Sequence, residues 1–401
     1  MNILRNKKVF VLALIILSGC TSGGSDGGGG GSSDLTFDQI EITTVTDAAG
    51  QAHFPFDIGD SQKAFNIEVS SAFGQVQLDS VIGPAGQELI TAENAPFLTS
   101  SIALQNSPNV VRFPFLTGAV SSGRYTAHYS VVNGRTPMPG ANAIASVVAK
   151  QDGTGDSGVL RVNMVLVGPV TDANDARESL ESAVTIWAQI YGRIGITLDV
   201  KWYDYAGTAV LPNPAGGDIF YDTLSRSTRE GAINVVVGSE VRGTGTSGSG
   251  NRYGISGGFP GSALPGPRSA VALSVLRVTA GDGRFDFIGT GGNQGHNDET
   301  RLAAEELARL AANYLGLPNT VIFGGGLSSR VTSSDFLPDS PGCLTYADCR
   351  NDKSARTNLM FPEIVEKLPQ DRDSRQITEY YGRDQFSAQQ REVLNGSVLV
   401  K

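Results

Sequence analysis

The chain has 401 residues, of which 40% are hydrophobic and 18% charged. This composition supports ordered cores and excludes a chain that is disordered throughout. The length suits about two or three domains. The formal net charge of −9 is opposite in sign to what phosphate binding requires, so we expect no nucleic-acid partner. The 50 glycines indicate long loops and strands rather than a helical bundle.

The N-terminus has the features of an export signal. A basic segment (5–8) precedes an apolar run (9–17) that is too short to span a membrane comfortably, so residues 1–19 are predicted to be a signal peptide. The tetrapeptide Leu17-Ser18-Gly19-Cys20 resembles the lipobox of bacterial lipoproteins. That resemblance implies a lipid anchor on Cys20. An ordinary secretory signal with an incidental cysteine is the alternative.

Thr21, rather than Asp, follows Cys20. This resembles the outer-membrane sorting pattern of Gram-negative lipoproteins and implies a bacterial outer-membrane location, facing the periplasm or the cell surface. Residues 20–34 are mostly Gly and Ser and are predicted to form a flexible tether between the membrane and the folded part.

Residues 35–152 show the pattern of short strands separated by turns. Apolar and polar residues roughly alternate over 37–42, 65–69 and 125–131. Period-two alternation at this spacing predicts an antiparallel β-sandwich. His128 lies within the last of these strands, and we expect it to be a structural or surface histidine rather than a metal ligand.

Residues 153–401 change in character and predict an α/β domain with a mixed sheet. Strands and helices are expected in the following order: strand 158–168, helix 172–191, strands 196–200, 233–237 and 270–275, and helix 298–315. Asn297 or Asp298 is expected to cap the last helix, and Gly316 to end it.

Two cysteines remain once Cys20 is assigned to the anchor. Cys343 and Cys349 are close in sequence within an exported chain, which predicts a local disulfide. A cysteine-based metal site is the alternative, but it lacks further cysteines and a nearby histidine.

The run from Arg309 to Thr320 resembles the active-site helix and turn of metzincin metallopeptidases, whose motif is H-E-x-x-H-x-x-G-x-x-H. Gly316 fixes the register, and its flanking residues resemble the pappalysin-like branch. Segments 335–341, 357–362 and 386–390 resemble later parts of that branch. The resemblance implies that Met360 is the methionine of the family's Met-turn and that Ser387 caps a C-terminal helix.

The residues on which metzincin chemistry depends are replaced. In this register the three zinc-ligand positions hold Arg309, Asn313 and Asn319, and the general-base position holds Leu310. A catalytic zinc needs about three protein ligands and an open position for water. Arginine is a permanent cation, asparagine amides are poor zinc ligands, and leucine accepts no proton. We therefore expect no catalytic residues and no bound zinc, and no other cofactor apart from the calcium considered below.

Several alternatives remain open. Glu305 or Glu306 is expected to pair with Arg309 along the helix in place of a metal. A shifted metal site would instead combine these glutamates with Asp298 and His296. Calcium binding by two acidic residues is left open, although turn capping is the commoner role of such residues. These two are Asp335 and Asp339.

The sequence thus predicts a membrane-anchored binding or scaffolding pseudo-protease. Its partners are the membrane, through Cys20, and a peptide or protein held in the vestigial cleft. The alternative is an active zinc-dependent endopeptidase with atypical ligands.

Overall fold

The computed structural model describes residues 38–90, 109–115, 117–151, 157–168, 176–242, 253–279, 298–323, 331–334, 337–362, 366–367, 379–380 and 382–401. The predicted signal peptide, Cys20 and the tether lie outside these stretches, as do His296 and Asp335. Within the described stretches, no helix is both long and apolar enough to cross a membrane.

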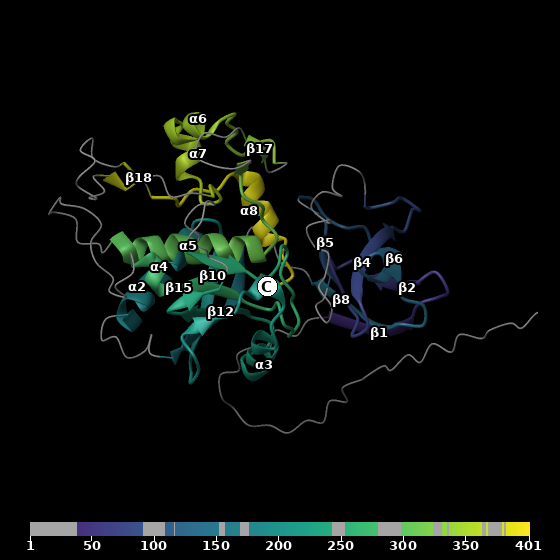
Figure 1. Cartoon of the computed structure of the whole chain (residues 1–401). Helices are drawn as coiled ribbons and strands as arrows, with labels where there is room; N and C mark the ends of the chain where they lie inside the picture. The colour runs from purple at the N-terminus through teal and green to yellow at the C-terminus, as the bar shows by residue number, and fades with distance from the viewer. Residues whose placement is uncertain are drawn as a thin grey trace, which may run out of the picture.

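Residues 38–151, here called the N-terminal unit, form two antiparallel sheets (Figure 1). One has the order β1-β8-β3-β5, and the other the order β2-β6-β4 with β7 beside β6. The strands are β1 (Asp38–Val45), β2 (Gln51–Ile58), β3 (Ala64–Ser70), β4 (Gln75–Ile82), β5 (Asn109–Phe113), β6 (Gly123–Asn133), β7 (Thr136–Pro137) and β8 (Asn142–Lys150). Buried aromatic and aliphatic side chains from both sheets share one core, so the sheets pack face to face.

Strand β2 shows why the sequence folds this way. Its residues Phe54, Phe56 and Ile58 are buried, while the residues between them are exposed. Successive side chains of a strand point to opposite faces, so this alternation places one face on the core and the other in solvent. The antiparallel sheets expected in this part of the chain are present.

Residues 157–401, the C-terminal unit, contain a five-stranded sheet of order β10-β9-β12-β15-β14. Its strands are parallel except β14, which is antiparallel to β15. The elements up to residue 314 are β9 (Gly158–Val167), α2 (Ala176–Gly192), β10 (Ile196–Tyr205), β11 (Val210–Leu211), η2 (Pro214–Gly216), α3 (Ile219–Ser227), β12 (Ile233–Gly238), β13 (Glu240–Val241), β14 (Gly254–Ser256), β15 (Val271–Ser274), α4 (Val275–Val278) and α5 (Asp298–Tyr314). The predicted mixed α/β organisation is confirmed.

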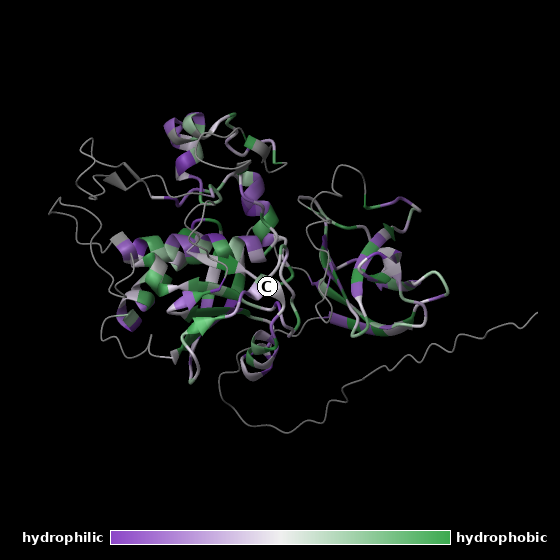
Figure 2. Ribbon diagram, viewed as in Figure 1, coloured by the Kyte–Doolittle hydropathy of each residue, from purple (hydrophilic) through white to green (hydrophobic). Residues whose placement is uncertain are grey.

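Helices cover both faces of this sheet (Figure 1). Apolar side chains of α2 and α5 share one core with one face of β9 and β12. The opposite face of the same strands packs with α3. Strands buried on both faces are mostly apolar, and β9 and β12 consist mainly of Val, Ile, Leu and Met. Figure 2 shows hydrophobic segments within the sheet and on the helices that cover it.

The remaining elements follow α5 along the chain. They are β16 (Val321–Phe323), β17 (Val331–Ser334), α6 (Tyr346–Asn351), α7 (Lys353–Thr357), β18 (Glu366–Lys367), β19 (Glu379–Tyr380) and α8 (Ala388–Asn395). Ser387 caps α8 as expected, and Gln390 completes a capping box with it.

The part of the sheet formed by β3, β5 and the end of β8 is buried on both faces, and the C-terminal unit contacts it there. Every residue of β5 is buried, in contrast to the alternation in β2. Glu68, on β3, accepts hydrogen bonds from the Ser262 hydroxyl and, at 2.7 Å, from the Ala263 N–H. Burial raises the pKa of Glu68 to about 7, and these hydrogen bonds oppose the rise.

Two buried cations also link the units. Arg112 donates to the Leu315 carbonyl at 3.0 Å, at the end of α5, and Lys150 donates to the Asn395 carbonyl, at the end of α8. Burial lowers the pKa of Arg112 to about 10 and that of Lys150 to about 8. The N-terminal unit therefore holds the carbonyl ends of two helices, and one of these helices carries the candidate site.

Candidate functional site

The predicted motif lies at the C-terminal end of α5. Small side chains line the buried surface of this helix and allow close packing; they are Ala303, Ala304, Ala308, Ala311 and Ala312. The Tyr191 hydroxyl of α2 donates to the Ala308 carbonyl at 2.8 Å. The helix observed over Asp298–Tyr314 confirms the predicted element, although the side chain of Asp298 lies outside the described atoms.

Gly316 ends α5 in a left-handed conformation. Its N–H donates to the Asn313 carbonyl at 3.0 Å, and the Leu317 N–H donates to the Ala312 carbonyl at 2.9 Å. This pair of bonds is the Schellman motif, which needs a residue of positive φ. The φ of Gly316 is 96°, and an added Cβ would lie 3.3 Å from Arg112 Nη1. Backbone conformation and the approach of the N-terminal unit therefore both favour glycine here.

The turn brings the three expected zinc-ligand positions together. Arg309 Nη1 lies 3.4 Å from Asn313 Oδ1 and 3.4 Å from Asn319 Oδ1. Asn313 Nδ2 donates to the Leu317 carbonyl at 2.8 Å and lies 3.4 Å from Asn319 Oδ1. The three positions therefore lie together, and the group at their centre is a guanidinium.

Arg309 is fixed by a carboxylate one turn before it. Its Nη2 lies 2.7 Å from Glu306 Oε2, and its Nε lies 3.3 Å from Glu306 Oε1. Both side chains are buried, at 10% and 2% exposure. Two parallel hydrogen bonds orient a guanidinium firmly. Of the two glutamates expected to pair with Arg309, Glu306 is the one found there.

Glu305 instead faces two other arginines. Arg301 Nε lies 3.0 Å from Glu305 Oε1, and Arg383 Nε lies 3.8 Å from Glu305 Oε2. Arg383 also donates to Glu306 Oε1 and, at 2.8 Å, to the Phe361 carbonyl. The two adjacent glutamates are thus engaged by arginines, which makes them poor candidates for the shifted metal site.

The charges around Glu306 determine its protonation. Burial by itself raises the pKa of this carboxyl, but the neighbouring charges of Arg309 and Arg383 outweigh that effect and lower the pKa to about 2. Glu306 is therefore ionised at neutral pH and compensates the buried guanidinium groups.

The general-base position belongs to the apolar core. Leu310 is 3% exposed and packs with the core between α5 and the sheet. A Cβ added to Gly254, on the antiparallel edge strand β14, would lie 2.5 Å from Leu310 Cδ1. The close approach of α5 to β14 at this point depends on the glycine.

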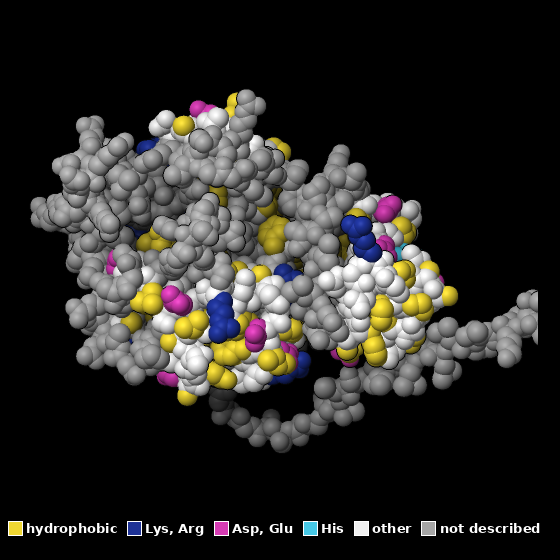
Figure 3. Space-filling view, viewed as in Figure 1, with side chains coloured by type: hydrophobic (Ala, Val, Ile, Leu, Met, Phe, Trp, Pro, Cys, Tyr) yellow, Lys and Arg dark blue, Asp and Glu magenta, His cyan; other side chains and the backbone are white. Residues whose placement is uncertain are grey.

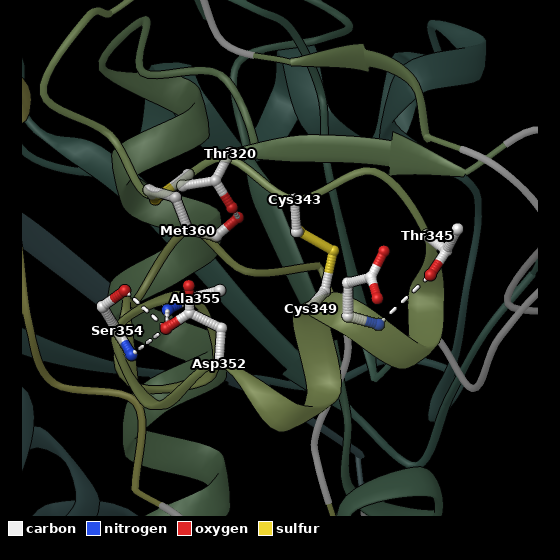
Figure 4. Close-up of a disulfide and its surroundings, with 9 residues drawn as sticks. Thr320, Cys343, Thr345, Cys349, Asp352, Ser354, Ala355 and Met360 are labelled. Carbon is white, nitrogen blue, oxygen red and sulfur yellow. Dashed lines mark hydrogen bonds between the residues drawn. A yellow bond between two sulfur atoms is a disulfide. The ribbon is translucent and has the colours of Figure 1, made fainter.

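Met360 lies in a buried turn next to the site. The Phe361 N–H donates to the Asn358 carbonyl at 3.0 Å, and the Met360 N–H donates to Asn358 Oδ1 at 2.9 Å. The Thr320 N–H donates to the Met360 carbonyl at 3.0 Å, which links this turn to the residue after Asn319. Figure 4 shows Thr320 and Met360 together near the disulfide.

The predicted disulfide between Cys343 and Cys349 is present, with a Cα–Cα distance of 5.1 Å. Cys349 is buried within α6, where the side chain of Thr345 caps the helix. Asp352 similarly caps α7, which leads to the turn of Met360 (Figure 4). The disulfide therefore holds the segment that precedes this turn.

Asp339 has a capping role. Its Oδ1 accepts from the Ser387 hydroxyl and its Oδ2 from the Gln389 N–H, both at 2.8 Å, at the start of α8. Within the described part of the chain, no group of three His, Cys, Asp or Glu side chains is arranged to hold a metal.

Arg383 is the important residue that sequence reasoning missed. It is fully buried, yet it lies 74 positions after Arg309 in a segment with no motif. No local pattern indicates that a distant arginine joins Glu306.

No protein-family model matches this chain, and no curated protein matches it. An archaemetzincin from Methanopyrus kandleri is similar over 61% of this chain and 90% of its own, with 13% sequence identity and a TM-score of 0.28. Metalloproteinase-II from Bacteroides fragilis is similar over 44% of this chain and 52% of its own, with 12% identity and a TM-score of 0.26. Since both TM-scores are low, the assignment of the site depends on the residues of this chain.

Those residues do not fit a catalytic zinc. A cation at the centre of the three positions would meet the positive charge of Arg309, and only amide groups remain beside it. The carboxylate nearest this centre, Glu306, is already engaged by two guanidinium groups.

Proposed function

We propose that this protein is an exported, lipid-anchored binding or scaffolding protein whose C-terminal unit has metzincin architecture without a metal centre. The observation that carries this proposal is the buried, bidentate ion pair between Arg309 and Glu306. A guanidinium held in this way occupies the meeting point of three positions that a metzincin uses for zinc.

Several features support the proposed metzincin architecture of the C-terminal unit. The parallel sheet has an antiparallel edge strand, β14, which packs against α5. Gly316 ends α5 at the motif's glycine, and a buried turn at Met360 is hydrogen-bonded to Thr320. In this proposal residues 35–152 are a β-sandwich domain, residues 153–401 are the metzincin-like domain, and the turn at Met360 is its Met-turn.

The same residues argue against hydrolysis. Peptide cleavage by a metzincin needs a polarising metal and a group that accepts a proton from water. Leu310 lies where that group would be and packs into the core. Loss of a general base alone costs about 10²–10⁴-fold in rate.

A binding role remains open to this surface. The side chains of Asn313 and Asn319 are partly exposed beside Arg309. Amide and guanidinium groups provide donors and acceptors that suit a peptide backbone. The proposed partner is therefore a peptide or protein segment that lies across the vestigial cleft.

The first experiment tests the missing chemistry. Tag-free protein is purified, its zinc content is measured by mass spectrometry, and peptide hydrolysis is assayed with and without a chelator. We expect much less than one zinc per chain and no chelator-sensitive cleavage. Stoichiometric zinc together with hydrolysis that the chelator abolishes would establish the alternative, an active endopeptidase with atypical ligands.

A second experiment tests the anchor. Cys20→Ala is compared with Ser22→Ala, a neighbouring change outside the lipobox. Cys20→Ala is expected to prevent lipidation, so the protein loses its acyl chains. Since each buried acyl methylene contributes ~0.8 kcal/mol to membrane binding, the protein should then leave the detergent phase. An intact mass without acyl chains in the unmodified protein would contradict the anchor.

A further inference from the structure

The N-terminal unit carries a pair of histidines on its outer sheet. His53 on β2 and His128 on β6 are directly opposite each other in the antiparallel register. They are two of the three histidines in the chain. Their ring centroids are 5.5 Å apart, and the ring planes differ by 29°.

Both histidines point away from the core. Phe54 and Ala127, the next residues along each strand, are buried, so the alternation of the strands directs His53 and His128 outward. His53 is exposed and His128 is half-buried. Among the described residues, the C-terminal unit contacts the other sheet, through Glu68. In Figure 3 a histidine surface, coloured cyan, is visible on the N-terminal unit.

A carboxylate lies beside the pair. Asp79 is the extra residue of an irregularity in β4, where Leu78 pairs with Tyr129 and Ser80 pairs with His128. Asp79 Oδ1 accepts from the Ser130 hydroxyl at 3.2 Å. A bulge re-aims the side chain of its extra residue, and here it places a negative charge close to His128. Partial burial raises the pKa of Asp79, while the Ser130 hydrogen bond and the charge of His128 lower it.

The spacing suits one shared metal ion. With metal–nitrogen bonds of ~2.0–2.1 Å, two imidazoles on one metal have ring centres roughly 4.5–5.5 Å apart for the usual bond angles. The observed 5.5 Å separation is at the upper end of that range. The rings are stacked, and imidazole lone pairs lie in the ring planes, so both side chains must rotate to turn a nitrogen toward a shared ion. Asp57 and Arg124 occupy opposed positions four residues away along β2 and β6.

We propose that His53 and His128 form a surface site for a divalent transition-metal cation, with Asp79 as the adjacent negative charge. Imidazole nitrogens suit Cu²⁺, Ni²⁺ and Zn²⁺, and the general order of affinities places Cu²⁺ first. Bound metal cross-links β2 to β6 and stabilises the folded N-terminal unit by mass action. This site is separate from the motif around Arg309 and does not depend on the function proposed for it.

The test uses the tag-free mature chain titrated with Cu²⁺, followed by calorimetry and by the electron paramagnetic resonance spectrum of the bound ion. We expect one Cu²⁺ per chain with nitrogen hyperfine structure from two imidazoles. His53→Gln and His128→Gln are each expected to weaken binding at least about tenfold, since loss of even an outer-shell partner costs about 10–100-fold in metal affinity.

His296→Gln is the matched control, because it removes the third histidine of the chain. The Cu²⁺ affinity of this variant is expected to equal that of the unmodified protein. A thermal shift with Cu²⁺ that disappears in His53→Gln supports the cross-link. Copper binding that survives the double replacement of His53 and His128, or that depends on His296, overturns the proposal. An electron paramagnetic resonance spectrum without hyperfine structure from imidazole nitrogens also overturns the proposal.

Discussion

Replacing Glu306 by glutamine removes the negative charge that Arg309 and Arg383 share in the interior. The pKa of this carboxyl falls from 4.5 to about 2 on folding, which corresponds to about 3 kcal/mol of stability at neutral pH. Breaking a buried ion pair by removing one partner typically costs ~3–5 kcal/mol. Glu306→Gln is therefore expected to lower the free energy of unfolding by about 3–5 kcal/mol.

Urea unfolding, followed by circular dichroism and by the fluorescence of buried Trp187, measures this loss. Glu181→Gln is the matched control, because Glu181 pairs with Arg177 on an exposed helix surface where its side chain is 51% accessible. Exposed pairs of this kind contribute ~0.3–0.5 kcal/mol. A loss below about 1 kcal/mol for Glu306→Gln would refute the claim that this carboxylate stabilises the buried guanidinium groups.

The pH dependence gives an independent check of the same ion pair. Since the pKa of Glu306 is lower in the folded than in the unfolded protein, its contribution to folding stability is present above pH 4.5 and is lost as the pH falls toward 2. The unmodified protein should lose this stability over that interval, whereas Glu306→Gln should not. Equal slopes for the two proteins would contradict the assignment.

Three further predictions concern the surroundings of the site. Gly316→Ala is expected to cost about 1–3 kcal/mol because of its positive φ and the nearby Arg112, whereas Gly192→Ala, which has open space around its Cβ, should be neutral or stabilising; thermal unfolding distinguishes them. Removing the disulfide with the double substitution Cys343→Ser and Cys349→Ser should lower the free energy of unfolding by roughly 2 kcal/mol, a modest loss because the closed loop is short. An unchanged melting temperature would contradict this. Glu68 has a folded pKa of about 7, above its unfolded value, so its contribution to stability is fully present below pH 4.5 and is lost as the pH rises through 7. Glu68→Gln should remove this pH dependence of the free energy of unfolding, and an unchanged pH dependence would exclude Glu68 as its source.

The elements that could be predicted from sequence are those with strong periodicity. Helix α5 and strand β9 match their predicted ranges closely, because long apolar patterns and a terminal glycine define them. Helical spacing also places Arg309 and Asn313 on one face of α5, whereas Asn319 joins them only after the turn at Gly316.

Other features depend on contacts between distant segments. The burial of β5 on both faces follows from packing against the C-terminal unit, which the β5 sequence does not reveal. Arg383 reaches Glu306 across 77 positions, and His53 meets His128 only through strand register. Edge strand β14 has three residues, too few for a periodic signal.

The most direct test of the central claim is to restore the metzincin residues and measure bound zinc beside the unmodified protein. The restored chain carries Arg309→His, Leu310→Glu, Asn313→His and Asn319→His, with folding verified by circular dichroism. The account predicts far less than one zinc per unmodified chain and one tightly bound zinc per restored chain. One tightly bound zinc in the unmodified chain would contradict the claim that an arginine has replaced the metal, and a folded restored chain that binds none would contradict the metzincin register.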